Sequence, residues 1–138
     1  MQKPENRAGR LRAAGLAALG WAALAAVYTL LVPGGAGKAP RTLSGILRTL
    51  LVLPVAEEVL FRGAALRLLR PLGRGWAILG QAVLFAAVHG TLVQKCYALG
   101  MGLIFGWAAE ETDSLAPGVV LHILNNGLVL ALAERGLG

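Results

Sequence analysis

The stretch LRAAGLAALGWAALAAVYTLLV, residues 11–32, carries one charged side chain, Arg12, in 22 positions. A helix that spans a bilayer needs about 20 consecutive, mostly apolar residues, so the stretch predicts a membrane helix over about 10–32. A secretory signal peptide also follows a basic start, but its apolar core has only about 7–15 residues. Pro33-Gly34-Gly35 ends the stretch without a small-residue cleavage site, and we expect the helix to be retained.

The composition of the whole chain also indicates an integral membrane protein. Of its 138 residues, 57% are hydrophobic and 14% are charged, whereas a soluble domain carries about 25% charge. A globule of this size cannot hide so much apolar surface from water. The net charge is +6, but the basic residues flank the apolar runs. This pattern suits contact with lipid headgroups of a bilayer and argues against a nucleic-acid partner.

Four more apolar runs predict four more helices, so the expected fold class is an all-α, polytopic transmembrane bundle of about five helices. Their ranges are about 43–70, 76–89, 93–109 and 115–133. Segments 76–89 and 93–109 are short for a span, and residues 110–114 predict a polar loop. Strands are not expected, because the runs do not alternate and an open sheet edge cannot face lipid.

Proline and glycine predict the interruptions of these helices. Pro54 lies inside the second helix, and residues 71–75, with Pro71, Gly73 and Gly75, are expected to break the chain after it. Gly102 and Gly106 form a small-xxx-small pair, whose expected use is close packing of a neighbouring helix.

The chain divides into two parts, and its basic residues predict an orientation. Residues 1–42 hold the basic start, the first helix and a Pro/Gly linker over 33–40; residues 43–138 hold a core with polar motifs. With the N-terminus inside, seven basic residues lie inside and four outside, which favours a cytoplasmic N-terminus. The inner set is Lys3, Arg7, Arg10, Arg12, Arg67, Arg70 and Arg74; the outer set is Lys38, Arg41, Lys95 and Arg135.

A few polar side chains lie within the apolar runs. An ionisable group at the centre of a membrane helix costs at least about 2.5–3.5 kcal/mol, and it marks a functional site by default. The set comprises Arg48, Glu57, Glu58, Arg62, His89 and His122, with Asn126 as a neutral member.

Two adjacent carboxylates begin the run Glu57-Glu58-Val59-Leu60-Phe61-Arg62. Neighbouring helical residues point about 100° apart, so the two glutamates face different directions. Glu58 and Arg62 are four residues apart and predict an ion pair. Glu57 has no such partner, and an unpaired carboxylate in low dielectric can act as a general base. The alternative is that all three form one network that only holds helices together.

The two histidines extend this set. His89 ends an apolar segment, where a lone histidine is more often a hydrogen-bonded core residue. His122 and Asn126 lie four residues apart on one helix face, and two convergent donors suit an oxyanion hole. The alternative is interhelical hydrogen bonding, which is all that we expect of Asn125. If Glu57, His89, His122 and Asn126 converge, the set suits amide hydrolysis by activated water.

These residues resemble the motifs of the CPBP family of intramembrane proteases, also called the CAAX prenyl protease and bacteriocin-processing or Abi family. Its motifs EExxxR, FxxxH and HxxxN occur in order at 57–62, 85–89 and 122–126. The resemblance covers about residues 43–133.

The resemblance implies a glutamate-dependent endopeptidase that acts on a membrane-anchored protein or peptide. Glu57 and His89 would activate water, and His122 and Asn126 would stabilise the oxyanion. Glu58 and Arg62 would support the site. Family members usually carry more than five helices, so a second copy or a partner subunit is expected to complete the wall of the site.

Other readings of the same residues stay open. Glu57, His89 and His122 would also match the three protein ligands of a catalytic zinc; because the HExxH helix is absent, a metal-free mechanism is favoured over zinc or another divalent metal. A non-catalytic membrane immunity or scaffold protein and a small proton-coupled transporter are the competing functions. The richness in Ala, Gly, Leu and Arg is typical of a bacterial protein, which predicts the bacterial inner membrane as its location.

Overall fold

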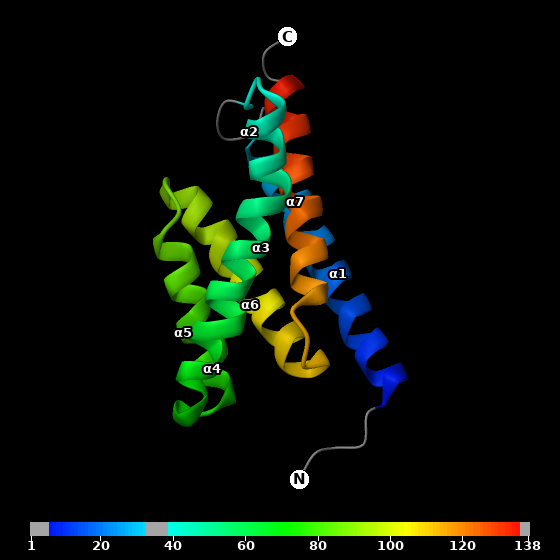
Figure 1. The fold of residues 1–138 in the computed structure, drawn as a ribbon, viewed down its shortest axis with the longest axis vertical. Helices are drawn as coiled ribbons and strands as arrows, with labels where there is room; N and C mark the ends of the chain where they lie inside the picture. Colours follow the sequence, from blue (N-terminus) through cyan, green and yellow to red (C-terminus); the bar gives the residue numbers. More distant parts are fainter. Residues whose placement is uncertain (1–5, 33–38, 136–138) are drawn as a thin grey trace.

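The structure is a computed structural model that describes residues 6–32 and 39–135. These residues are helical apart from short turns and contain no strand, which confirms the all-α prediction. Figure 1 shows an elongated bundle in which several helices are inclined to the long axis. Most of the expected linker, residues 33–38, lies outside the described residues, as do Lys3 and Lys38 of the orientation argument.

Three helices are long and apolar enough to cross a membrane: α1 (Arg7–Leu31), α6 (Leu92–Thr112) and α7 (Ala116–Arg135). The expectation that the 93–109 segment is short is therefore wrong. The predicted polar loop begins later, because α6 continues through Glu110 and Glu111 to Thr112, whose hydroxyl donates to the Ala108 carbonyl at 2.7 Å. The helix ends at Asp113, which has a left-handed φ of 48°.

The predicted second helix is one bent rod that runs over residues 43–69 (Figure 1). It consists of α2 (Leu43–Leu47), the π-helical turn η1 (Arg48–Val52), α3 (Leu53–Glu58), a second π-helical segment η2 (Val59–Ala65) and α4 (Leu66–Leu69). Pro54 is the second residue of α3, just after the first π turn. Proline lacks an N–H and its ring clashes with the carbonyl four residues earlier, and a wider turn relieves both.

A tight hairpin follows the rod. The 3₁₀ turn η3 (Arg70–Leu72) leads to Gly73, which has a φ of 102°. Glycine adopts this angle without the steric clash that a Cβ atom would cause. Helix α5 (Arg74–Ala87) begins directly afterwards, so Gly75 lies inside a helix and its predicted role as a breaker is wrong. With 14 residues α5 is short, as expected. It ends two residues before His89.

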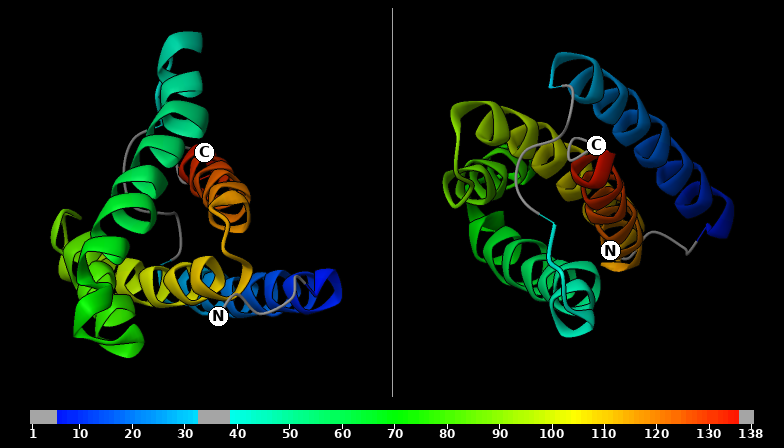
Figure 2. Two further views of the ribbon diagram at one scale, coloured as in Figure 1. Left: turned by 60° about the horizontal axis from the view of Figure 1, so that its bottom comes forward. Right: turned by 90° about the horizontal axis from the view of Figure 1, so that it is seen from above.

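Helix α6 lies at the centre of the bundle and packs against α5 on one side and α1 on another (Figure 2). The approach to α5 is close because Gly102 lies against the backbone of α5: a Cβ there would stand 2.8 Å from Ala82 Cα. Beside it, the buried Gln81 amide donates to the Gly102 carbonyl at 2.6 Å. The predicted packing role of the small residues is thus confirmed at Gly102.

Helix α1 is held to the core by a polar contact as well as by apolar packing. The buried Asn125 on α7 accepts hydrogen bonds through Oδ1 from Trp21 Nε1 of α1 at 3.1 Å and from the Tyr97 hydroxyl of α6 at 2.5 Å. The Tyr28 ring packs against the Tyr97 ring at a tilt, with ring centroids 4.3 Å apart. Asn125 therefore joins three helices, which is the interhelical role expected of it.

We predict that Gly102→Ala destabilises the bundle, because the new methyl group collides with backbone that cannot move without separating α5 from α6. Overpacking of this kind costs about 1–3 kcal/mol, and it should lower the thermal unfolding midpoint in detergent. The matched control is Gly15→Ala on α1, where an added Cβ meets nothing within 4 Å. An unchanged midpoint for Gly102→Ala would contradict this packing.

Candidate active site

A buried carboxylate, Glu58, lies at the centre of the polar cluster. Its Oε1 atom is 3.0 Å from Arg62 Nη1 and 2.9 Å from His122 Nδ1. The side chains of Glu58 and Arg62 are fully buried, and that of His122 is 4% exposed. The ion pair predicted from the four-residue spacing is confirmed, and the third partner comes from α7, 64 positions along the chain.

Aromatic rings surround the Arg62 guanidinium. Its central carbon lies 4.3 Å from the centroid of Phe85 and 5.5 Å from that of Phe105, both within cation–π range. Within the described residues, none of its three nitrogens has a partner with hydrogen-bond geometry, although Nη1 is close to Glu58. The charge of Arg62 is therefore balanced by Glu58 and by two ring faces.

Gly118 on α7 gives Glu58 the space that it occupies. A Cβ at this position would stand 2.5 Å from Glu58 Oε2. Any larger residue would push the carboxylate away from His122. Sequence reasoning missed Gly118, although it lies one turn before His122 on the same helix face and the spacing could have pointed to it.

Glu57 also reaches His122, from the other side of the ring. Its Oε2 lies 3.5 Å from His122 Nε2, while its side chain stays 32% exposed. The His122 imidazole thus lies between two carboxylates, one buried and one accessible. Because the Glu58 carboxylate, paired with Arg62, only accepts, His122 Nδ1 carries a hydrogen.

His89 joins the cluster through an aromatic ring. Its Nδ1 donates to the Phe85 carbonyl at 2.8 Å, because a carbonyl only accepts, and this leaves Nε2 as a lone pair in the neutral ring. The Phe85 ring makes edge contacts with both imidazoles, with centroids 4.7 Å from His89 and 5.7 Å from His122. Within the described residues, no ion pair or hydrogen bond joins His89 to Glu57.

Asn126 contacts the bent rod. Its Nδ2 donates to the Thr49 carbonyl at 2.9 Å. One of the two amide hydrogens is therefore engaged, and the second is left for another acceptor.

The described residues do not supply the ligands of a metal site. No three His, Cys, Asp or Glu side chains among them are gathered so that they could hold a metal ion. The zinc set considered from the sequence, Glu57 with His89 and His122, is not assembled, and we derive no step through a metal.

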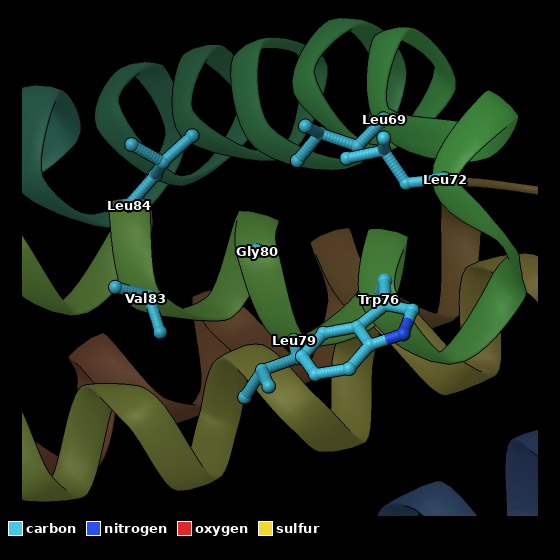
Figure 3. A pocket seen from close by; sticks show the side chains of 7 residues that line it. All are labelled: Leu69, Leu72, Trp76, Leu79, Gly80, Val83 and Leu84. Carbon is cyan, nitrogen blue, oxygen red and sulfur yellow. The ribbon is translucent and has the colours of Figure 1, made fainter.

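An apolar groove lies away from this cluster. Figure 3 shows an apolar groove between the end of the bent rod and α5, with a volume of about 710 Å³. Leu69 and Leu72 line one wall, and Trp76, Leu79 and Val83 are among the residues of the other. None of the polar cluster lines it. The groove is therefore separate from the candidate active site.

Comparison with known proteins identifies the family. Residues 39–128 match the protein family described as type II CAAX prenyl endopeptidase Rce1-like. The match includes the bent rod, α5, α6 and the part of α7 that holds His122 and Asn126, while α1 lies outside it. No curated protein and no solved structure matches the chain. The three polar motifs and this match lead to one conclusion: the chain belongs to the type II CAAX prenyl endopeptidase Rce1-like family, within the CPBP proteases that its motifs resemble.

Proposed function

We propose that the protein is a glutamate-dependent intramembrane endopeptidase, which hydrolyses a peptide bond of a membrane-anchored protein or peptide. The observation that carries the proposal is the position of His122 between Glu57 and Glu58, in the core of a bundle whose surface is apolar. Two carboxylates and two basic side chains are gathered where charge is costly, and packing alone does not require them. The family supports the same reaction class.

Glu57 and His89 would activate the water. Of the two glutamates, Glu57 is the accessible one. The Nε2 lone pair of His89 would accept a hydrogen bond from the same water molecule and so orient it. Glu57 takes a proton from the water molecule as the water oxygen attacks the carbonyl carbon of the substrate. After the tetrahedral intermediate forms, Glu57 returns this proton to the leaving nitrogen as the C–N bond breaks. The products are a carboxylic acid and an amine, which become a carboxylate and an ammonium when the acid gives its proton to the amine.

His122 and Asn126 would stabilise the oxyanion of the intermediate. Nδ1 of His122 is engaged with Glu58, so the ring would donate to the oxyanion through Nε2–H. Nε2–H and the second amide hydrogen of Asn126 are then the donors for the developing charge. Glu58 and Arg62 act as support, because they hold the ring through Nδ1.

The membrane context follows from the same reasoning. The substrate enters from the bilayer or its surface, and a second copy of the chain or a partner subunit completes the wall around it. We place the protein in a bacterial inner membrane with its N-terminus in the cytoplasm. A membrane scaffold or immunity protein and a proton-coupled transporter are the functions that the following experiment separates from proteolysis.

We predict that Glu57→Gln abolishes substrate processing and leaves the fold intact, because the amide keeps the shape of the side chain and cannot take a proton. The measurement compares the lengths of membrane proteins in cells that lack the gene and in cells that carry each variant. The control is Glu134→Gln, an exposed glutamate on α7, which should restore processing. Full processing by Glu57→Gln would contradict the proposal. Ion flux in proteoliposomes that stops with Glu57→Gln would identify a transporter instead.

We also predict that Arg62→Met strongly destabilises the protein, because it leaves the buried Glu58 carboxylate without its arginine partner. Removing one partner of a buried ion pair costs about 3–5 kcal/mol. The double variant Glu58→Gln/Arg62→Met should regain most of this loss, since the glutamine oxygen still accepts from His122. Thermal unfolding in detergent measures both, with the exposed Arg67→Met as the control on the same rod. An unchanged midpoint for Arg62→Met would show that the pair does not support the site.

A further inference from the structure

The bent rod contains a backbone carbonyl that its own helix leaves without a partner. Thr49 lies in η1, where its carbonyl could accept from the N–H four or five residues later. The first of these, Leu53 N–H, donates to the Arg48 carbonyl instead. The second position is Pro54, which has no N–H. Neither helical register therefore satisfies the Thr49 carbonyl.

A side chain from another helix supplies the missing donor. Asn126 Nδ2 of α7 lies 2.9 Å from the Thr49 carbonyl oxygen. In a membrane protein a backbone polar group must find its partner within the protein, because the surrounding lipid offers none. The contact thus joins a defect created by Pro54 in one helix to an amide on another.

A second contact between α7 and the rod lies one helical turn away from the Asn126–Thr49 hydrogen bond. Asn126 and His122 are one turn apart on α7, and they touch Thr49 and Glu58 on the rod. As α7 proceeds from His122 to Asn126, the contacts on the rod move back from Glu58 to Thr49, so the two helices run antiparallel. Figure 1 shows α7 beside α2 and α3. Two contacts at separate levels fix the rotation and the height of one helix against the other.

We infer that Asn126 is a positioning residue: its hydrogen bond to the Thr49 carbonyl, which Pro54 leaves unpaired, aligns α7 with the rod and thereby sets Glu57 against His122. This role is distinct from oxyanion stabilisation, since it uses the other amide hydrogen. Its kinetic part rests on the proposed function, whereas its structural part does not.

The experiment is a double-mutant cycle between Pro54→Ala and Asn126→Ala. Asn126→Ala leaves the carbonyl unpaired and should lower the thermal unfolding midpoint in detergent. Adding Pro54→Ala returns an N–H to the rod, so it should restore much of that loss. The control is Asn125→Ala, a neighbouring buried asparagine whose contacts are Trp21 and Tyr97. Pro54→Ala should not rescue this variant.

The kinetic readout uses the processed substrate that the gene-deletion comparison identifies. The kinetics are measured on the single variant Pro54→Ala, because it keeps the Asn126 amide of the proposed oxyanion hole while the restored N–H replaces that amide at the Thr49 carbonyl. This variant should keep its KM and show a kcat lower by on the order of tenfold to a hundredfold, because α7 is no longer tied to the rod. Additive effects on the midpoint, or an equal rescue of Asn125→Ala, would overturn the inference. An unchanged kcat for Pro54→Ala would overturn its positioning part. If no substrate is processed at all, the proposed function fails, and the unfolding cycle still decides whether the Thr49–Asn126 link exists.

Discussion

The buried Glu58 carboxylate is the contact on which the rest of the site depends. It pairs with Arg62 one turn along its own rod and accepts from His122 on α7. Gly118 makes room for it, and the rings of Phe85 and Phe105 lie against its cation partner. A buried charge is tolerated only when its partners are held in place. The helices that supply those partners are therefore fixed relative to one another. The accessible Glu57, next to Glu58 on α3, is fixed with them.

The bundle solves a second constraint, which is the absence of water around its backbone. A π-helical turn over Arg48–Val52 precedes Pro54 and the short helix α3 that carries the two glutamates, and a side-chain amide from α7 satisfies a carbonyl of this turn. π-Helical turns are found frequently at functional sites. Here one stands on each side of α3, so the short helix with Glu57 and Glu58 is framed by two segments of irregular geometry.

The sequence was sufficient to predict the helices and the members of the polar cluster, since both follow from local patterns. Apolar run length predicted the spans, and the four-residue spacing predicted the Glu58–Arg62 pair. It underestimated α6, because Glu110 and Glu111 look like loop residues until Arg70 and Arg74 are seen to pair with them. The sequence did not predict contacts between helices that are far apart along the chain. Helical periodicity shows which residues share a face, but it does not show that Gly118 faces Glu58 or that Asn126 faces Thr49.

The most direct test of the account is the hydrogen bonding of the chain's two histidines, observed by solid-state NMR of ¹⁵N-histidine-labelled protein in lipid bilayers. The account predicts two distinct rings, both with hydrogen on Nδ1: that of His89 is bound to a backbone carbonyl, whereas that of His122 is bound to a carboxylate and the His122 Nε2 atom faces Glu57. In Glu57→Gln the His122 signals should shift while those of His89 stay close to their positions. Two similar histidines with signals of solvent-exposed rings, and no response of His122 to Glu57→Gln, would contradict the central claim that His122 lies between the two glutamates.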